Sequence, residues 1–156
     1  DLRALYAAYE RLRDAPPIAG SRTSTLLHEP DAQRVARQAL ARAQEELEEL
    51  RGVLVGTHRH AGGERDVILE ASQVGYWVTV AAVAQRVRYD DWAPHRAWLS
   101  GWYDAPSSLE ARDADAPTAL AAPLSDAGAL CRAAGVHPAR VIAADLADMR
   151  RKHVAK

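Results

Sequence analysis

Carboxylate side chains recur on two neighbouring segments at spacings that could bring them together. Glu46 and Glu49 follow Arg42 in one segment, and Glu70 and Gln73 stand in the next. In an α-helix, residues three or four apart share a face, so each segment would present its oxygen atoms along one edge. Oxygen atoms that face each other across two helices suit Mg²⁺ or Mn²⁺. Such an ion can bridge phosphate oxygens and activate an attacking water.

The two segments have the periodicity of long helices. One predicted helix runs from Asp31 to about Val55, and a second runs from about Glu64 to Val87. The glycine-rich stretch 56–63 separates them, and so short a loop favours antiparallel packing with the two polar edges meeting beside the core. The apolar stripe of the first of these helices consists of Val35, Ala39, Ala43, Leu47, Leu50 and Leu54.

The remaining segments are also helical or irregular, with no strand pattern. A first helix starting at Leu2 should stop before Pro16 and Pro17, because proline cannot continue a helix. The pattern predicts a loop over 18–28, a short helix from Asp90 through Leu99 closed by Gly101, an irregular stretch over 105–123, and closing helices over 126–134 and 138–151.

These elements predict an all-α bundle of about five to six helices. Most sides of the predicted helix 64–87 are apolar, which favours a central position or completion of the bundle by dimerisation. The expected organisation is a helical core over 1–104, a linker or irregular excursion over 105–125, and C-terminal helices over 126–156 that pack on the core.

Composition narrows the classes of function. Twenty basic and 21 acidic residues nearly cancel, so no global charge points to nucleic acid or to an anionic membrane. The longest apolar stretches, such as Val78 to Ala84, are much shorter than the roughly 20 residues of a membrane span. Cys131 is the single cysteine, which excludes an intrachain disulfide and is typical of a reducing cytoplasm.

Three segments resemble the phosphoribosyl-ATP pyrophosphohydrolases and, more broadly, the MazG-like nucleotide pyrophosphohydrolases. They are Ser-Arg-Thr-Ser-Thr-Leu-Leu at 21–27, Arg-Ala-Gln-Glu-Glu-Leu-Glu-Glu at 42–49, and Glu-Ala-Ser-Gln-Val-Gly-Tyr-Trp at 70–77. Their order and approximate spacing are similar to those of the family. The resemblance implies an all-α, dimeric or higher homo-oligomeric enzyme that uses Mg²⁺ to release pyrophosphate from a nucleotide-like substrate.

The resemblance also implies roles for individual residues. Glu46, Glu49 and Glu70 would ligate the metal, and Arg42 would contact the substrate phosphate. Glu45 belongs to the same acidic motif and joins the candidate catalytic set. The family motif ends in aspartate where this chain has Gln73, a weaker ligand, and Asp66 lies one turn earlier on the same edge as a further candidate.

The C-terminal segment gives a second, shorter similarity. Residues 135–141 and 148–152 resemble the closing helix of MazG-like enzymes, which makes Arg150, Arg151 and Lys152 candidates for binding phosphate or a base. These basic residues equally suit a helix C-terminus, where positive charge interacts favourably with the helix dipole.

Two readings from other classes of function compete with the enzyme. Gln73 favours a non-catalytic nucleotide-binding or interaction module with a degraded metal site. The acidic run could also be a solvated face of a helical oligomerisation domain. His58 and His60 are potential metal ligands, but two histidines in a glycine-rich loop without further ligands are more typical of surface residues.

Overall fold

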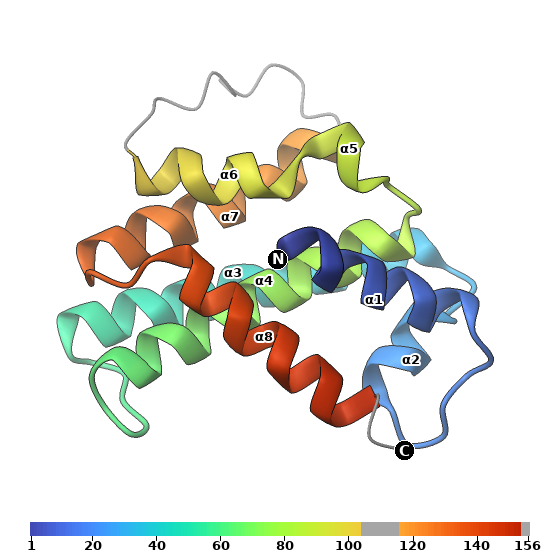
Figure 1. Cartoon of the computed structure of the whole chain (residues 1–156), viewed down its shortest axis with the longest axis horizontal. Coiled ribbons are helices and arrows are strands. Elements are labelled where there is room, and N and C mark those ends of the chain that lie inside the picture. The colour runs from blue at the N-terminus through green and yellow to red at the C-terminus, as the bar shows by residue number, and fades with distance from the viewer. Residues whose placement is uncertain (104–115, 154–156) are drawn as a thin grey trace.

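The computed structural model describes residues 1–103 and 116–153, and the described chain is helical throughout, with loops between the helices (Figure 1). The predicted all-α class is therefore confirmed. The helices are α1 (Leu2–Asp14), α2 (Arg22–Leu27), α3 (Ala32–Val55), α4 (Glu64–Ala84), α5 (Tyr89–Trp92), α6 (Pro94–Trp102), α7 (Ala116–Ala133) and α8 (Pro138–His153).

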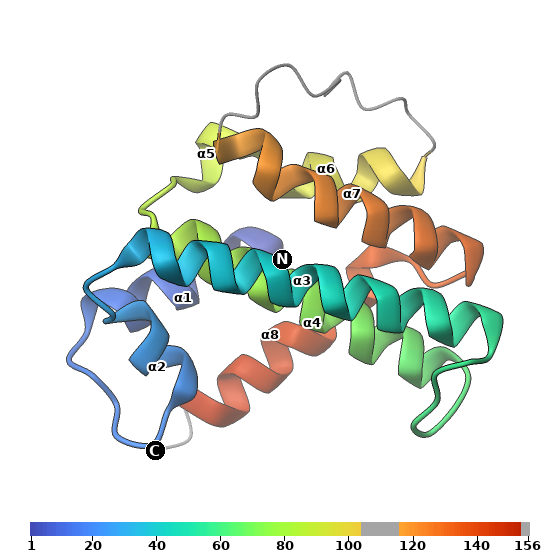
Figure 2. The ribbon, with the colours of Figure 1, turned by 180° about the vertical axis from the view of Figure 1, so that it is seen from behind.

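The antiparallel pair α3 and α4 forms the centre of the fold, as the short loop between them predicts (Figure 2). The Asp31 carboxylate caps α3 by accepting from the Arg34 backbone N–H at 2.8 Å, and α3 ends at Gly56 in the left-handed conformation, with φ 83°. The interior of α4, including Val74 and Val78, is fully buried because α1, α3, α7 and α8 surround it.

Helix α2 lies where the sequence pattern indicated a loop. Ser21 caps it, since its Oγ accepts from the Ser24 backbone N–H at 3.2 Å. One capped turn of this kind is too short to show an apolar period, which explains why the pattern missed it. α2 lies near the end of α8, although the two are far apart in the sequence (Figures 1 and 2).

The helix expected from Asp126 begins ten residues earlier, at Ala116. Much of the expected excursion is therefore the first half of α7, with Pro123 inside the helix. The rest of that excursion, 105–115, lies outside the described residues.

The single helix expected from Asp90 to Leu99 is split into α5 and α6. The break falls before Pro94, whose ring disfavours the right-handed helical conformation for the preceding residue. Ala93, at that position, adopts the left-handed conformation, with φ 45°. Gly101, expected to end the helix, lies inside α6. A Cβ at Gly101 would overlap the Ser125 carbonyl of α7, so glycine here allows two helix backbones to touch.

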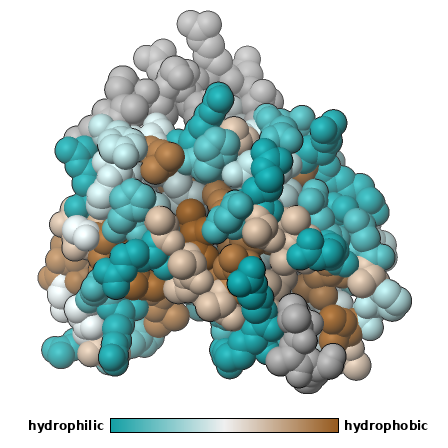
Figure 3. Space-filling model, in the orientation of Figure 1, coloured by the Kyte–Doolittle hydropathy of each residue, from teal (hydrophilic) through white to brown (hydrophobic). Residues whose placement is uncertain are grey.

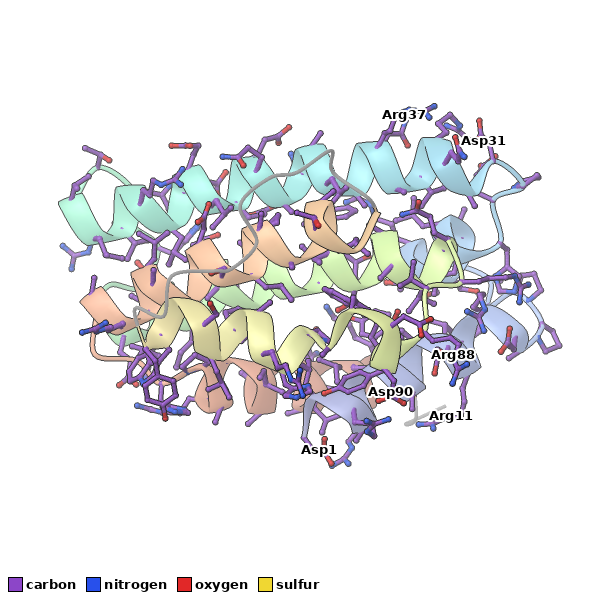
Figure 4. All side chains as sticks on the ribbon, turned by 90° about the horizontal axis from the view of Figure 1, so that it is seen from above. Asp1, Arg11, Asp31, Arg37, Arg88 and Asp90 are labelled. Carbon is purple, nitrogen blue, oxygen red and sulfur yellow. The ribbon has the colours of Figure 1, made fainter. Side chains whose placement is uncertain are left out.

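Hydrophilic side chains cover much of the face drawn in Figure 3, with apolar residues in small patches between them. Asp31 and Arg37 lie on one side of the molecule, and Asp1 and Asp90 lie on the opposite side (Figure 4). By length and apolar composition, α4 alone among the described helices could cross a membrane, yet 61% of its apolar window is buried within the fold. That is the pattern of a core helix and is compatible with a soluble protein.

Candidate metal centre and adjoining cleft

Four metal-binding side chains converge where α3 and α4 meet their connecting loop. Glu49 comes from α3, Glu70 from α4, and His58 and His60 from the loop, and one donor atom of each lies within 4.8 Å of all the others. The Nε2 atoms of the two histidines are 2.9 Å apart, and Glu70 Oε1 lies 3.3 Å from His58 Nε2 and 2.9 Å from His60 Nε2. The Glu49 carboxylate lies 3.4 Å from His58 Nε2.

Asp66 holds the loop that carries the two imidazoles. Its buried carboxylate accepts from the backbone N–H groups of His60 at 2.8 Å, Ala61 at 2.9 Å and Gly62 at 2.9 Å. These hydrogen bonds, led by the one from His60, lower the pKa of Asp66, because each favours the charged carboxylate. Asp66 stands in the first turn of α4, so it fixes the loop to the helix that bears Glu70.

Glu46 lies one helical turn before Glu49 and is 5% exposed. Its Oε1 accepts from Trp77 Nε1 at 3.3 Å and from Arg42 Nη2 at 3.2 Å. Burial raises the pKa of Glu46; the hydrogen bond from Trp77 opposes this effect, and the nearby charge of Glu49 adds to it. Glu46 thus lies beside the four converging donors and is held in place by residues of the cleft.

A cleft of about 790 Å³ begins next to this carboxylate and is lined by residues of α1, α2, α3, α4 and α8. Arg42, Glu46 and Trp77 line its α3–α4 side, whereas the four converging donors do not line it. The guanidinium carbon atoms of Arg22 and Arg42 lie 5.1 and 5.7 Å from the Trp77 ring centroid. The cleft therefore has a cationic and aromatic edge on the side of the acidic cluster.

The opposite wall of the cleft comes from α1 and α8. The half-buried Asp145 lines this wall together with Tyr9, Asp148 and Lys152. Burial, with a smaller effect from the charge of Asp148, raises the pKa of Asp145 to about 7, although Lys152 and a hydrogen bond with Tyr9 act in the opposite direction. Lys152 pairs with Asp148 at 2.5 Å. This wall carries a carboxyl group that titrates near neutral pH.

The candidate residues from the sequence fall into three groups. Glu49 and Glu70 converge within the cluster; Arg42, Glu46, Gln73 and Lys152 line the cleft; and Glu45, Asp66, Arg150 and Arg151 lie elsewhere. The side chain of Glu45 is 55% exposed and pairs with Arg42, and Arg151 pairs with Asp148 on the surface of α8. Asp66, considered as a ligand from its helical position, directs its carboxylate into the loop backbone.

The sequence pattern did not select His58 and His60, which it favoured as surface residues. Their partners lie nine residues before and twelve residues after His58, on two different helices, so no short motif contains the set. The sequence held one indirect signal for the position of the two histidines. Asp66 stands in the first turn of α4, where a carboxylate can accept from the backbone of the preceding loop.

Comparison of the chain with protein-family models, with curated proteins and with solved structures finds no match. Assignment of the site therefore depends on its own chemistry: two carboxylates and two imidazoles that converge, and a cleft with cationic and aromatic side chains one helical turn away.

Proposed function

We propose that this chain is a metal-dependent phosphohydrolase that releases pyrophosphate from a nucleotide-like substrate bound in the cleft. The observation that supports the proposal best is the pairing of a metal-binding cluster with a cleft of suitable size and charge, linked through Glu46. Ligand-binding clefts have volumes of roughly 300–1,000 Å³, and this one, at about 790 Å³, falls within that range.

The charges in the cleft fit a phosphate chain. Arg22 and Arg42 flank Trp77 on the side nearest the cluster, and Lys152 lies on the α8 wall. Guanidinium groups bind phosphate oxygens in a two-pronged geometry, and aromatic rings such as Trp77 and Tyr76 offer surfaces for a base or a ribose. Arg42 also pairs with Glu46, one helical turn before Glu49, so the phosphate-binding edge of the cleft and the metal-binding cluster lie on the same helix.

In the proposed reaction, water attacks a phosphorus atom of the substrate, and the bond from that phosphorus to the bridging oxygen breaks. Pyrophosphate leaves with that oxygen. A metal held by Glu49 and Glu70 would supply positive charge to offset the charge that develops on the phosphate oxygens. Glu46 is suited to accept the proton of the attacking water, because its pKa is raised by burial and a base works best when its pKa approaches the ambient pH.

The test measures pyrophosphate release from a panel of nucleoside triphosphates and phosphoribosyl nucleotides, with Mg²⁺, with Mn²⁺ and without metal. Glu49→Gln should lower kcat/KM by at least about 100-fold, a loss of ~3 kcal/mol of transition-state stabilisation. Glu48→Gln is the matched control, because the Glu48 side chain is 63% exposed on the same helix and pairs with Arg51. Turnover that survives Glu49→Gln would reject the proposed role of the metal.

Gln73 supports a second candidate, a nucleotide-binding module without turnover. Gln73 lines the cleft with a neutral amide at the position where the resembling enzymes have a carboxylate. Calorimetric binding of a nucleotide without any pyrophosphate release would favour this module over the hydrolase. A homodimer and a cytoplasmic location, both expected from the sequence, remain part of the proposal.

A further inference from the structure

We infer that Glu49, His58, His60 and Glu70 form a mixed nitrogen and oxygen site for a divalent transition-metal ion of the Zn²⁺ type, in preference to Mg²⁺. The inference names the metal of the site described above and rests on the proposed function for any role of that metal in turnover. Binding of the ion itself depends only on the four side chains.

The first support is a contact pattern that protons alone cannot satisfy. His58 Nε2, His60 Nε2 and Glu70 Oε1 form a triangle with edges of 2.9, 2.9 and 3.3 Å. An imidazole nitrogen offers either one N–H or one lone pair, so it cannot make two separate hydrogen bonds at once. With Glu70 ionised, at least one edge must therefore bring two donors or two acceptors together. A cation at the centre would turn all three atoms into ligands.

The second support is the burial of Glu70, whose side chain is 2% exposed. Among the described residues, its ion-pair partners are the imidazoles of His58 and His60, and no lysine or arginine pairs with it. A buried carboxylate without a compensating positive charge is costly, and so is the approach of Glu49 to the same point. A divalent cation would balance both carboxylates.

The distances agree with ligands that surround one small ion. For bonds of about 2.1 Å, adjacent ligand atoms lie roughly 3.0 Å apart in an octahedral site and roughly 3.4 Å apart in a tetrahedral one. Four contacts at this site run from 2.9 to 3.4 Å. The donor atoms that are farther apart lie within 4.8 Å, and a bound ion would draw them closer together. Asp66 holds the loop in this arrangement, so the donors are positioned before an ion arrives.

The donor types decide which ion is preferred. Imidazole nitrogen suits Zn²⁺, Fe²⁺, Ni²⁺ and Cu²⁺, whereas Mg²⁺ takes oxygen ligands and retains its waters. Two of the four donors here are nitrogen atoms of His58 and His60.

Calorimetry of the whole chain without a histidine tag tests the inference, using Zn²⁺ and Mg²⁺ as separate titrants. We expect one Zn²⁺ per chain, bound at least 100-fold more tightly than Mg²⁺. His60→Ala should weaken Zn²⁺ binding by at least tenfold. His95→Ala is the matched control, because His95 is exposed on α6 and contacts Tyr89. The Zn²⁺ affinity of this variant should stay within twofold of that of the unaltered chain.

Two results would overturn the inference: equal affinity for Mg²⁺ and Zn²⁺ in the unaltered chain, or full Zn²⁺ affinity in His60→Ala. The first comparison needs no variant, so it holds even if a substitution harms folding. Visible absorption of the Co²⁺-loaded chain adds a spectroscopic check, since loss of an imidazole ligand should change the spectrum in His60→Ala and leave it unchanged in His95→Ala.

The failure of this inference and the failure of the proposed function give different results. Tight Zn²⁺ binding at the cluster without pyrophosphate release under any metal would reject the hydrolase and keep the metal site. Pyrophosphate release with Mg²⁺, together with equal affinity of the unaltered chain for Mg²⁺ and Zn²⁺, would reject the transition-metal site and keep the hydrolase.

Discussion

Replacing Asp66 by asparagine should loosen the loop between α3 and α4 while leaving the helices intact. The Asp66 carboxylate accepts three backbone N–H groups: Oδ2 binds those of His60 and Gly62, and Oδ1 binds that of Ala61. Asparagine keeps one acceptor oxygen and turns an NH₂ group toward the remaining N–H. The substitution therefore removes one hydrogen bond and the negative charge that strengthens the other two.

The size of the effect follows from hydrogen bonds to charged groups, which contribute about 1.5–3 kcal/mol each. Losing one of them and weakening two others should lower the free energy of loop opening by about 2–4 kcal/mol. Each 1.4 kcal/mol corresponds to a tenfold change in an equilibrium constant, so the backbone amides of residues 60–62 should exchange with solvent at least ~30-fold faster. Because His58 and His60 would lose their fixed positions, Zn²⁺ affinity should fall by about 10- to 100-fold.

Hydrogen exchange of the backbone amides at 60–62, measured together with Zn²⁺ calorimetry, checks the prediction. Far-UV circular dichroism should stay unchanged, since the contacts that bury α3 and α4 do not involve the loop. Asp91→Asn is the control, because Asp91 is an exposed aspartate in the first turn of α5. Unchanged amide exchange together with unchanged Zn²⁺ affinity in Asp66→Asn would refute the view that Asp66 positions the imidazoles.

Three further predictions concern the cleft and the helix packing. Because the pKa of Asp145 is raised to about 7, the folded chain holds a proton that the unfolded chain releases near 3.8, so stability should fall as pH rises between these values. At 1.36 kcal/mol per pH unit the loss is at most about 4 kcal/mol. Partial exposure reduces the expected loss to about 2 kcal/mol. In Asp145→Asn, the free energy of unfolding in urea should no longer fall between pH 5 and pH 8. An equal fall in the variant and in the unaltered chain would contradict the role of Asp145. Gly101→Ala should lower the free energy of unfolding by about 1–3 kcal/mol in thermal denaturation, because the new Cβ overlaps the Ser125 carbonyl; an unchanged midpoint would show that α6 and α7 can separate without cost. Arg42→Ala should raise KM for a nucleotide about tenfold with a smaller effect on kcat, since a bound phosphate loses a charged partner worth about 1.4 kcal/mol. Arg37→Ala, exposed on the same helix, should leave KM unchanged (Figure 4), and equal effects of the two substitutions would exclude Arg42 as the phosphate contact.

The helical class and the central helix pair could be predicted because both depend on local periodicity. The stripe that includes Ala43 and Leu47 sets which face of α3 is buried, and the short loop fixes an antiparallel partner. Once these are known, the approach of Glu49 to Glu70 follows from helical geometry. The sequence therefore contained enough information to place two of the four converging donors.

The remaining features depend on contacts between segments that are distant in sequence. The side chains of His58 and His60 reach the site only because a loop of irregular conformation is bound to Asp66, and no periodic pattern describes such a loop. Gly101 looked like a helix end because glycine often has that role, whereas here its missing side chain allows α7 to approach. The hydrogen bond of Trp77 to Glu46 depends on how α3 and α4 pack, which no pattern within a single helix gives.

Anomalous X-ray diffraction from crystals of the chain grown with Zn²⁺ tests the central claim most directly. We predict one strong peak at the zinc edge, within bonding distance of Glu70 and of the Nε2 atoms of His58 and His60, with Glu49 beside it. The absence of zinc density between these side chains, in crystals where they keep their positions, would contradict the claim that α3, α4 and their loop form a metal site.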